Sequence, residues 1–174
     1  MAKPERSVAR RHASQAAGDV SHKTTSVTAS AASATPVSTT TPTRDAVIGQ
    51  VVWLMMQTPI FRHLFLADLE WMVMPPILLS QFRLFRIENR VVAFAAWAHL
   101  SEVVEARLQE ANPRLAPAEW KSGDRLWLIH LLAPFGHTEA ALADLEKTSL
   151  AGKSFKMHRV QRDGSRVVEQ RNQT

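Results

Sequence analysis

The pattern of apolar side chains divides this chain of 174 residues into two parts. Residues 1–44 are rich in Ser, Thr and Ala and contain almost no large apolar side chains. Such a segment cannot bury enough surface to offset the entropy that a chain loses on ordering. We therefore expect a disordered, basic tail over residues 1–44 and a single folded domain over residues 45–174.

Helical spacing of apolar residues recurs in the folded part. Helices are predicted from Asp45 to Thr58-Pro59, over residues 64–73, from Ser101, and from Thr138 to about residue 145, with a short turn at residues 118–120. We expect Asp45 to be the N-cap of the first helix and Pro75-Pro76 to stop the second. In the third helix, Val103, Val104 and Leu108 should face the core, and Glu105 should lie on the polar side.

Alternating or continuous apolar runs predict five strands. They cover residues 81–87, 91–98, 126–133, 154–161 and 165–170. Asn89 tolerates a left-handed conformation, so the first two strands should form a hairpin, and Arg162-Asp163-Gly164 predicts another between the last two. The order of helices and strands indicates an α+β or α/β domain built around a sheet.

The strand over residues 126–133 contains one polar side chain, His130, within an apolar run that stops at Pro134 and Gly136. A strand of this kind is typical of the buried centre of a sheet. A single imidazole there is either a hydrogen-bonded core group or part of a functional site, and the pattern leaves both readings open.

Charge and composition narrow the classes of function. The tail holds six Lys or Arg against two acidic residues, whereas the remainder holds fifteen against fourteen. The folded part therefore has no basic excess of the kind that nucleic-acid binding requires.

No cysteine is present, so thiolate metal sites and a cysteine nucleophile are excluded, and the histidines show no metal-ligand spacing. No apolar run is long enough to span a membrane, the tail offers no amphipathic helix for stable membrane insertion, and we expect a cytoplasmic protein.

Several short segments together resemble the RTX toxin-activating lysine acyltransferases. The resemblance runs from about residue 47 to residue 168. It rests on Val52-Trp53-Leu54, on Thr58-Pro59 followed by Arg62, on residues 71–75 and 94–97, and on Trp120, residues 122–127 and residues 133–136.

The resemblance implies a GNAT-like fold, with a central mixed sheet flanked by helices. It also implies transfer of a fatty acyl group from acyl carrier protein to internal lysines of an RTX protoxin, without a metal or other cofactor. Acyl carrier protein and the protoxin are then the expected partners, and a second copy of the chain is a further candidate partner. The candidate substrate-binding residues are Arg62 and Arg125. Four arginines either contact an acidic carrier protein or are ordinary solvated residues at strand edges: Arg83, Arg86, Arg90 and Arg125.

The chain departs from the family pattern at both catalytic positions. Phe61 occupies the position of the family's essential histidine, and His130 occupies that of its aspartate. A base must take a proton from the lysine ammonium, whose free pKa is about 10.4. If the chain is active, His63 or His130 is the candidate base. Backbone N–H groups near residues 133–136 are candidate donors to the oxyanion.

Two further alternatives stay open. The replacements at Phe61 and His130 are also expected of a family member that binds protoxin or acyl carrier protein without turnover. Likewise Met55, Met56, Met72 and Met74 either line a channel for a fatty chain or belong to the core.

Overall fold

The computed structural model describes residues 42–171 apart from residues 62, 110–113 and 162. Nearly the whole predicted tail, residues 1–41, lies outside the described residues. The rest forms a five-stranded sheet in the order β1-β2-β3-β4-β5. Its strands are β1 (Phe82–Ile87), β2 (Arg90–Leu100), β3 (Arg125–Leu132), β4 (Phe155–Val160) and β5 (Arg166–Arg171).

Neighbouring strands are antiparallel except β3 and β4, which are parallel. The expected mixed sheet and α+β class are therefore confirmed, as are the five strands and both hairpins. Glu88 and Asn89 have φ values of 46° and 65°, the left-handed pair that a two-residue hairpin turn requires. The GNAT-like topology stays a prediction.

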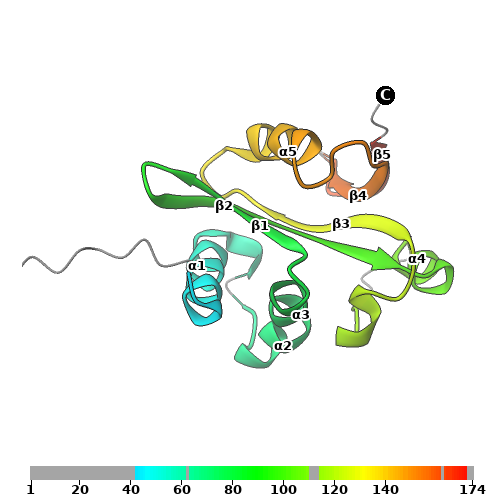
Figure 1. Cartoon of the computed structure of the whole chain (residues 1–174), viewed down its shortest axis with the longest axis horizontal. Helices are drawn as coiled ribbons and strands as arrows, with labels where there is room; N and C mark the ends of the chain where they lie inside the picture. Colours follow the sequence, from blue (N-terminus) through cyan, green and yellow to red (C-terminus); the bar gives the residue numbers. More distant parts are fainter. Residues whose placement is uncertain (1–41, 62, 110–113, 162, 172–174) are drawn as a thin grey trace, which may run out of the picture. The chain divides into compact units, whose positions relative to one another are not determined.

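Helices cover both faces of the sheet (Figure 1). They are α1 (Arg44–Gln57), α2 (Leu69–Met72), α3 (Met74–Leu78), α4 (Glu102–Gln109) and α5 (Thr138–Lys147), with short 3-10 turns at Pro59–Phe61, Leu66–Asp68 and Pro117–Trp120. Helices α1, α2 and α3 lie on one face and α5 on the other. Two apolar cores result, one under α5 and a larger one on the face of α1 to α4.

Two helix predictions need correction. Thr43, not Asp45, caps α1: its hydroxyl accepts from the backbone N–H of Ala46 at 3.3 Å. The helix predicted over residues 64–73 is shorter and interrupted, since residues 64 and 65 are not helical. Pro75 and Pro76 do not stop a helix but lie in the first turn of α3, where the missing N–H of a proline has no intrahelical partner to lose.

The predicted face of α4 is wrong in part: Val104 and Leu108 are buried as expected, but Val103 and Glu105 are not where they were predicted. Val103 is 79% exposed, whereas Glu105 is buried together with Val104 and Leu108. The carboxylate of Glu105 accepts from Trp127 Nε1 at 2.7 Å and pairs with Arg125 at 2.9 Å. Lys156 on β4 lies 3.1 Å from the same carboxylate. These partners compensate a buried charge that would otherwise be unfavourable, so the helix turns its acid inward.

A β-bulge in β3 changes which face its side chains point to. Ala96 of β2 pairs with His130, but the next residue, Trp97, pairs with Leu128, so Ile129 is an extra residue of β3. Side chains alternate along a regular strand, and one extra residue reverses that alternation. His130 consequently points to the face of α1 to α4, together with Trp127 and Ile129.

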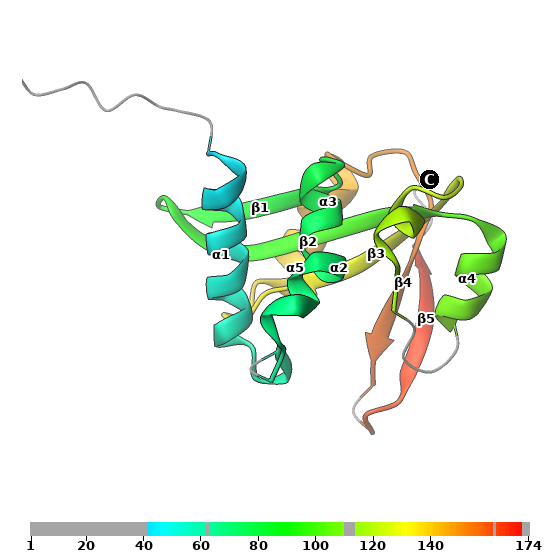
Figure 2. The ribbon, with the colours of Figure 1, turned by 90° about the horizontal axis from the view of Figure 1, so that it is seen from below.

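Beyond the bulge, β3 and β4 separate. Their parallel pairing is confined to Trp127 with Lys156 and Leu128 with Met157. In Figure 2, β4 and β5 run at a steep angle to β1 and β2. The residues that follow the two pairs, from Ile129 on β3 and His158 on β4, therefore have no strand beside them across this gap. The sheet opens there.

Gly123, in the turn before β3, should not tolerate a side chain. A Cβ atom built on it would lie 2.5 Å from the carbonyl oxygen of Leu100 and 2.6 Å from Cα of Ser101. Because both are backbone atoms, these close contacts can be removed only if the end of the strand shifts. We expect Gly123→Ala to lower the free energy of unfolding by about 1–3 kcal/mol. Gly49→Ala in α1, which meets nothing within 4 Å, should instead be neutral or stabilising. Equal denaturant midpoints for the two variants would contradict this.

Glu105 should be a pH-dependent stabilising group. Burial raises the pKa of its carboxyl, but the bonds to Trp127 and Lys156 and the charges of Lys156 and Arg125 outweigh burial, so the pKa lies below its usual value. A group of this kind stabilises the fold above its unfolded pKa, and the contribution is lost as pH falls through the folded pKa. Glu105→Gln should lower the free energy of unfolding at pH 7 by about 2 kcal/mol.

The matched control is Glu102→Gln, because Glu102 pairs with the same Arg125 at 3.1 Å but has an 82% exposed side chain. It should change stability by less than about 1 kcal/mol. Urea unfolding of both variants and the wild type at several pH values measures the difference. Glu105 is not a pH-dependent stabilising group if the difference in free energy of unfolding between Glu105→Gln and the wild type stays the same in acid.

Candidate functional site

The gap between β3 and β4 holds a cavity of about 370 Å³, lined on its other side by the start of α5. A second cavity of about 230 Å³ lies on the face of α1 to α4, between Trp71, Trp120 and Arg166. Phe61, Ile129, His130 and His158 line both cavities. We call the place where these four residues meet the imidazole cleft. The two histidines reach it from neighbouring strands at the point where pairing stops.

His130 is one of the two predicted candidate bases, and the structure places it in the imidazole cleft. Its Nε2 atom is buried and has no hydrogen-bond partner among the described residues. The ring lies against Trp120, with centroids 5.9 Å apart and planes tilted by 41°. Burial lowers the pKa of His130 to about 4, because a charged imidazolium loses hydration there. His130 is therefore a neutral imidazole at physiological pH, and the reading of it as a satisfied core group does not fit the unpaired Nε2.

His158 was not predicted to be a site residue. Its Nε2 lies 2.9 Å from the backbone carbonyl oxygen of Leu108 in α4, and its Nδ1 is buried with no partner in the described part of the chain. The ring also packs against Trp127 at 5.3 Å. Sequence reasoning offered no signal for it, because β4 joins β3 only through long-range pairing. A histidine in a short amphipathic strand is an ordinary surface residue until its neighbours are known.

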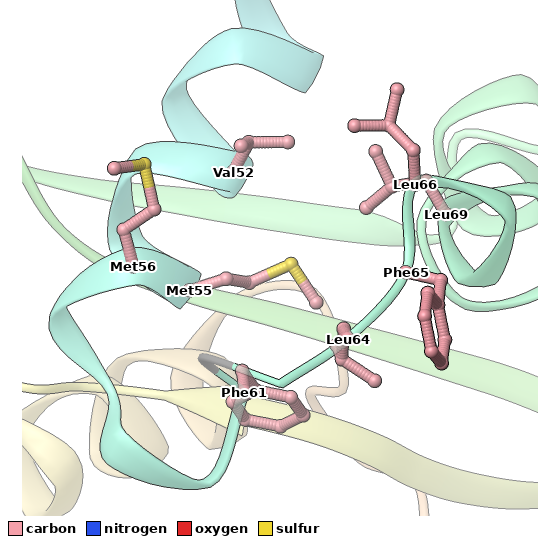
Figure 3. A pocket seen from close by; sticks show the side chains of 8 residues that line it. All are labelled: Val52, Met55, Met56, Phe61, Leu64, Phe65, Leu66 and Leu69. Carbon is pink, nitrogen blue, oxygen red and sulfur yellow. The ribbon is translucent and has the colours of Figure 1, made fainter.

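Phe61 connects the imidazole cleft to a third, apolar cavity of about 500 Å³. Figure 3 shows the side chains around it, which come from the end of α1 and from the segment that leads into α2. They are Val52, Met55, Met56, Phe61, Leu64, Phe65, Leu66 and Leu69. We call this the apolar pocket. Of the four methionines considered for a channel, Met55 and Met56 line it, whereas Met72 is buried in the core and Met74 is not among its lining residues.

The other predicted residues lie elsewhere. His63 is exposed and lines none of the cavities described above. Arg62 lies outside the described residues. Arg125 lines neither cavity of the imidazole cleft and pairs with Glu102 and Glu105, so its visible role is structural.

The cationic side chains of the β1–β2 hairpin have local partners. Arg83 pairs with Asp144 at 2.7 Å, and Arg86 donates to Gln50 at 2.7 Å. Arg90 is exposed at the start of β2. A carrier that docks on this hairpin would therefore compete with Asp144 and Gln50 for the first two guanidinium groups.

The turn that follows β3 leads into the cleft. The N–H of Gly136 donates to the carbonyl of Ala133 at 3.2 Å, so this predicted oxyanion donor is already engaged. Thr138 and Glu139, in the first turn of α5, line the larger cavity of the cleft, and Glu139 pairs with Arg159 at 2.9 Å. The first N–H groups of a helix have no intrahelical acceptor, so this turn is the better source of donors.

No metal-binding group of three or more His, Cys, Asp or Glu exists among the residues that the structure describes. Within the same residues, no helix has the length and apolar character needed to cross a membrane. The site offers the neutral imidazole of His130, the imidazole ring of His158, backbone donors and an apolar pocket. They suit acid–base chemistry on a substrate that carries a long apolar chain.

Several known proteins are similar to this chain, and lysine acyltransferases are among them. The chain is 30% identical over 124 residues to an uncharacterized protein of Synechocystis, covering 70% of this chain and 84% of that protein. It is 36% identical over 101 residues to the leukotoxin-activating lysine-acyltransferase LktC of a Pasteurella haemolytica-like species, covering 58% of this chain and 61% of LktC. With the protein-lysine palmitoyltransferase CyaC of Bordetella bronchiseptica it shares 34% identity over 136 residues, 75% of this chain and 72% of CyaC.

The family-level match covers the whole described part of the chain. The profile of the RTX toxin acyltransferase family matches residues 40–171, which include the apolar pocket and the imidazole cleft. The relatives and the profile agree, so the chain belongs to the RTX toxin acyltransferase family.

Proposed function

We propose that this chain transfers a fatty acyl group from acyl carrier protein to internal lysines of an RTX protoxin. Membership of the family supports the reaction class, and the names of the relatives LktC and CyaC support a lysine acceptor and a fatty acyl donor. The observation that carries the proposal is the junction at Phe61, where the apolar pocket meets the imidazole cleft. A fatty acyl thioester has these two parts, an apolar chain and a reactive carbonyl.

The apolar pocket suits the acyl chain. Its volume of about 500 Å³ lies within the range of about 300–1,000 Å³ that is usual for small-molecule sites. Met55 and Met56 adapt to irregular apolar shapes, as a flexible chain requires. Around its mouth, Phe65 is 78% exposed and Leu66 86% exposed. Covering such side chains with an acyl chain contributes about 0.8 kcal/mol for each buried methylene.

The imidazole cleft suits the amine. A lysine can attack the thioester only as a neutral amine, and His130 offers it an uncharged, buried nitrogen. Of the two predicted bases, we retain His130 as a residue that contacts the amine and leave His63 out of the site. The first turn of α5 supplies the donors to the oxyanion.

The proposed partners are acyl carrier protein and an RTX protoxin, in the cytoplasm. The carrier would dock on the cations of the β1–β2 hairpin, Arg83, Arg86 and Arg90, through its acidic surface. The reaction needs no metal and no dissociable cofactor, since the acyl donor arrives as a thioester. A homodimer is the remaining proposed association.

Intact-mass analysis tests the proposed function. The wild-type chain is incubated with acyl-loaded carrier protein and a cognate protoxin fragment, and the fragment is then weighed and mapped. We expect a mass gain of one or more acyl groups on lysine. The gain should depend on the acyl-loaded carrier and be absent with the unloaded carrier.

The double variant Phe61→His with His130→Asp restores the family pattern and is the matched comparison. Acylation by the double variant but not by the wild type would contradict the proposal and favour a chain that binds its partners without turnover. A loss of acylation in both would contradict acyl transfer altogether. Faster turnover in the double variant, with measurable wild-type turnover, agrees with the proposal.

His130 should also leave a signature in the pH dependence of stability. Its folded pKa is about 4, below the value of about 6.5 in an unfolded chain. The unfolded state therefore binds more protons between these values, and stability falls as pH drops from 6.5 to 4. In His130→Gln, the free energy of unfolding should fall by about 3 kcal/mol less over this pH range than in the wild type. His63→Gln, at an exposed position, should leave the fall unchanged. Identical acid profiles for the wild type and His130→Gln would show that the ring is not buried as described.

A further inference from the structure

We propose that His158 is the proton acceptor in acyl transfer and takes over the role that the family resemblance assigns to the position of Phe61. This inference rests on the proposed function and names the group that performs its proton transfer. It begins from one hydrogen bond. Nε2 of His158 lies 2.9 Å from the carbonyl oxygen of Leu108.

That bond determines the tautomer. A carbonyl oxygen only accepts hydrogen bonds, so Nε2 must carry a proton. In the neutral ring, Nδ1 then holds the lone pair. This nitrogen is buried and has no hydrogen-bond partner in the described part of the chain. In its neutral form, His158 therefore presents a free, buried acceptor at Nδ1, and the carbonyl of Leu108 in α4 sets this tautomer.

The ring is also held in place. Leu108 holds one edge, and Trp127 packs against the ring at 5.3 Å with planes tilted by 51°. After proton transfer, the imidazolium keeps its bond to the Leu108 carbonyl, because Nε2 is a donor in both states. A base that needs no rearrangement when it becomes charged is well suited to general-base catalysis.

The two predicted candidate bases lack this arrangement. His130 lines the same two cavities, but its buried Nε2 has no hydrogen-bond partner in the described part of the chain that would determine which nitrogen carries the proton. His63 is exposed and outside the cleft. We assign His130 to a contact with the amine, opposite His158, and the proton to His158.

One cation beside the cleft favours a neutral amine. Arg166 of β5 lines the smaller cavity together with His158. Arg159 lines the larger cavity, but it pairs there with Glu139 and with Glu169, so its charge is compensated. A cation beside a bound lysine disfavours its ammonium form relative to the amine.

Acyl transfer consists of attack by the amine on the thioester, followed by release of the carrier thiol. Water takes the proton that converts the lysine ammonium into the amine. The amine nitrogen attacks the thioester carbonyl carbon, a C–N bond forms, and Nδ1 of His158 receives one proton from that nitrogen. The C–S bond then breaks, and the imidazolium returns this proton to the leaving sulfur. The products are an amide and the free thiol of the carrier.

The decisive variant is His158→Gln. A glutamine amide still donates from a position near that of Nε2, so it keeps the bond to Leu108 while removing the basic nitrogen. We expect its single-turnover rate to fall by roughly 10²–10⁴-fold with unchanged melting temperature and unchanged binding of acyl-loaded carrier protein. His130→Gln is the matched control in the same cleft and should lose less rate.

A second variant keeps the inference testable if His158→Gln does not fold. His158→Ala leaves a space beside Trp127, and free imidazole added to the reaction should raise its rate in a saturable way. Imidazole should not raise the rate of the wild type or of His130→Gln. A purely structural role for His158 would give no such rescue.

The outcomes separate the two proposals. An inactive wild type overturns the proposed function, and this inference with it. An active wild type with full activity in His158→Gln overturns this inference alone. Loss of activity in His158→Gln and His158→Ala without imidazole rescue also overturns it, because the ring would then act through structure. Loss in both with rescue of His158→Ala supports it.

Discussion

The buried carboxylate of Glu105 is the interaction on which the rest of the structure depends. It accepts from Trp127 of β3 and pairs with Lys156 of β4, and these two residues form one of the two pairs that join the parallel strands. Through Glu105, α4 is thus bonded to both strands at the point where they pair. A charge buried in this way is tolerated only while its partners stay in place. The positions of β3 and β4 on either side of the Trp127–Lys156 pair follow from that constraint.

The opening of the sheet and the bulge of β3 act together to form the cleft. Strand separation beyond Leu128 and Met157 leaves space between β3 and β4, and the extra residue Ile129 turns His130 toward the face of α1 to α4. Without the bulge, His130 would point toward α5 and away from Trp120. Because α4 also carries the carbonyl that holds His158, the helix that Glu105 secures contributes to the orientation of the second imidazole.

Phe61 lies between the two parts of the proposed active site. The aromatic ring of Phe61 cannot accept a proton, but it lines the apolar pocket and the imidazole cleft at once. It therefore forms the wall between the place proposed for the acyl chain and the place proposed for the amine. Two imidazoles, on β3 and β4, line the cleft beside it, and the proposed reaction uses these.

Local patterns determined much of this protein from the sequence alone. The strands, the hairpin at Glu88 and Asn89 and the burial of β3 were readable, because turn chemistry and apolar periodicity act over a few residues. The family was recognised from the resemblance of several short segments. Long-range packing decided what the sequence could not show. The inward turn of Glu105 depends on Trp127 and Lys156, distant in sequence, and the pairing of His158 with Leu108 joins β4 to α4 across 50 positions. Only the tertiary structure brings such groups together, because a buried charge or lone pair takes its chemistry from neighbours that no local pattern specifies.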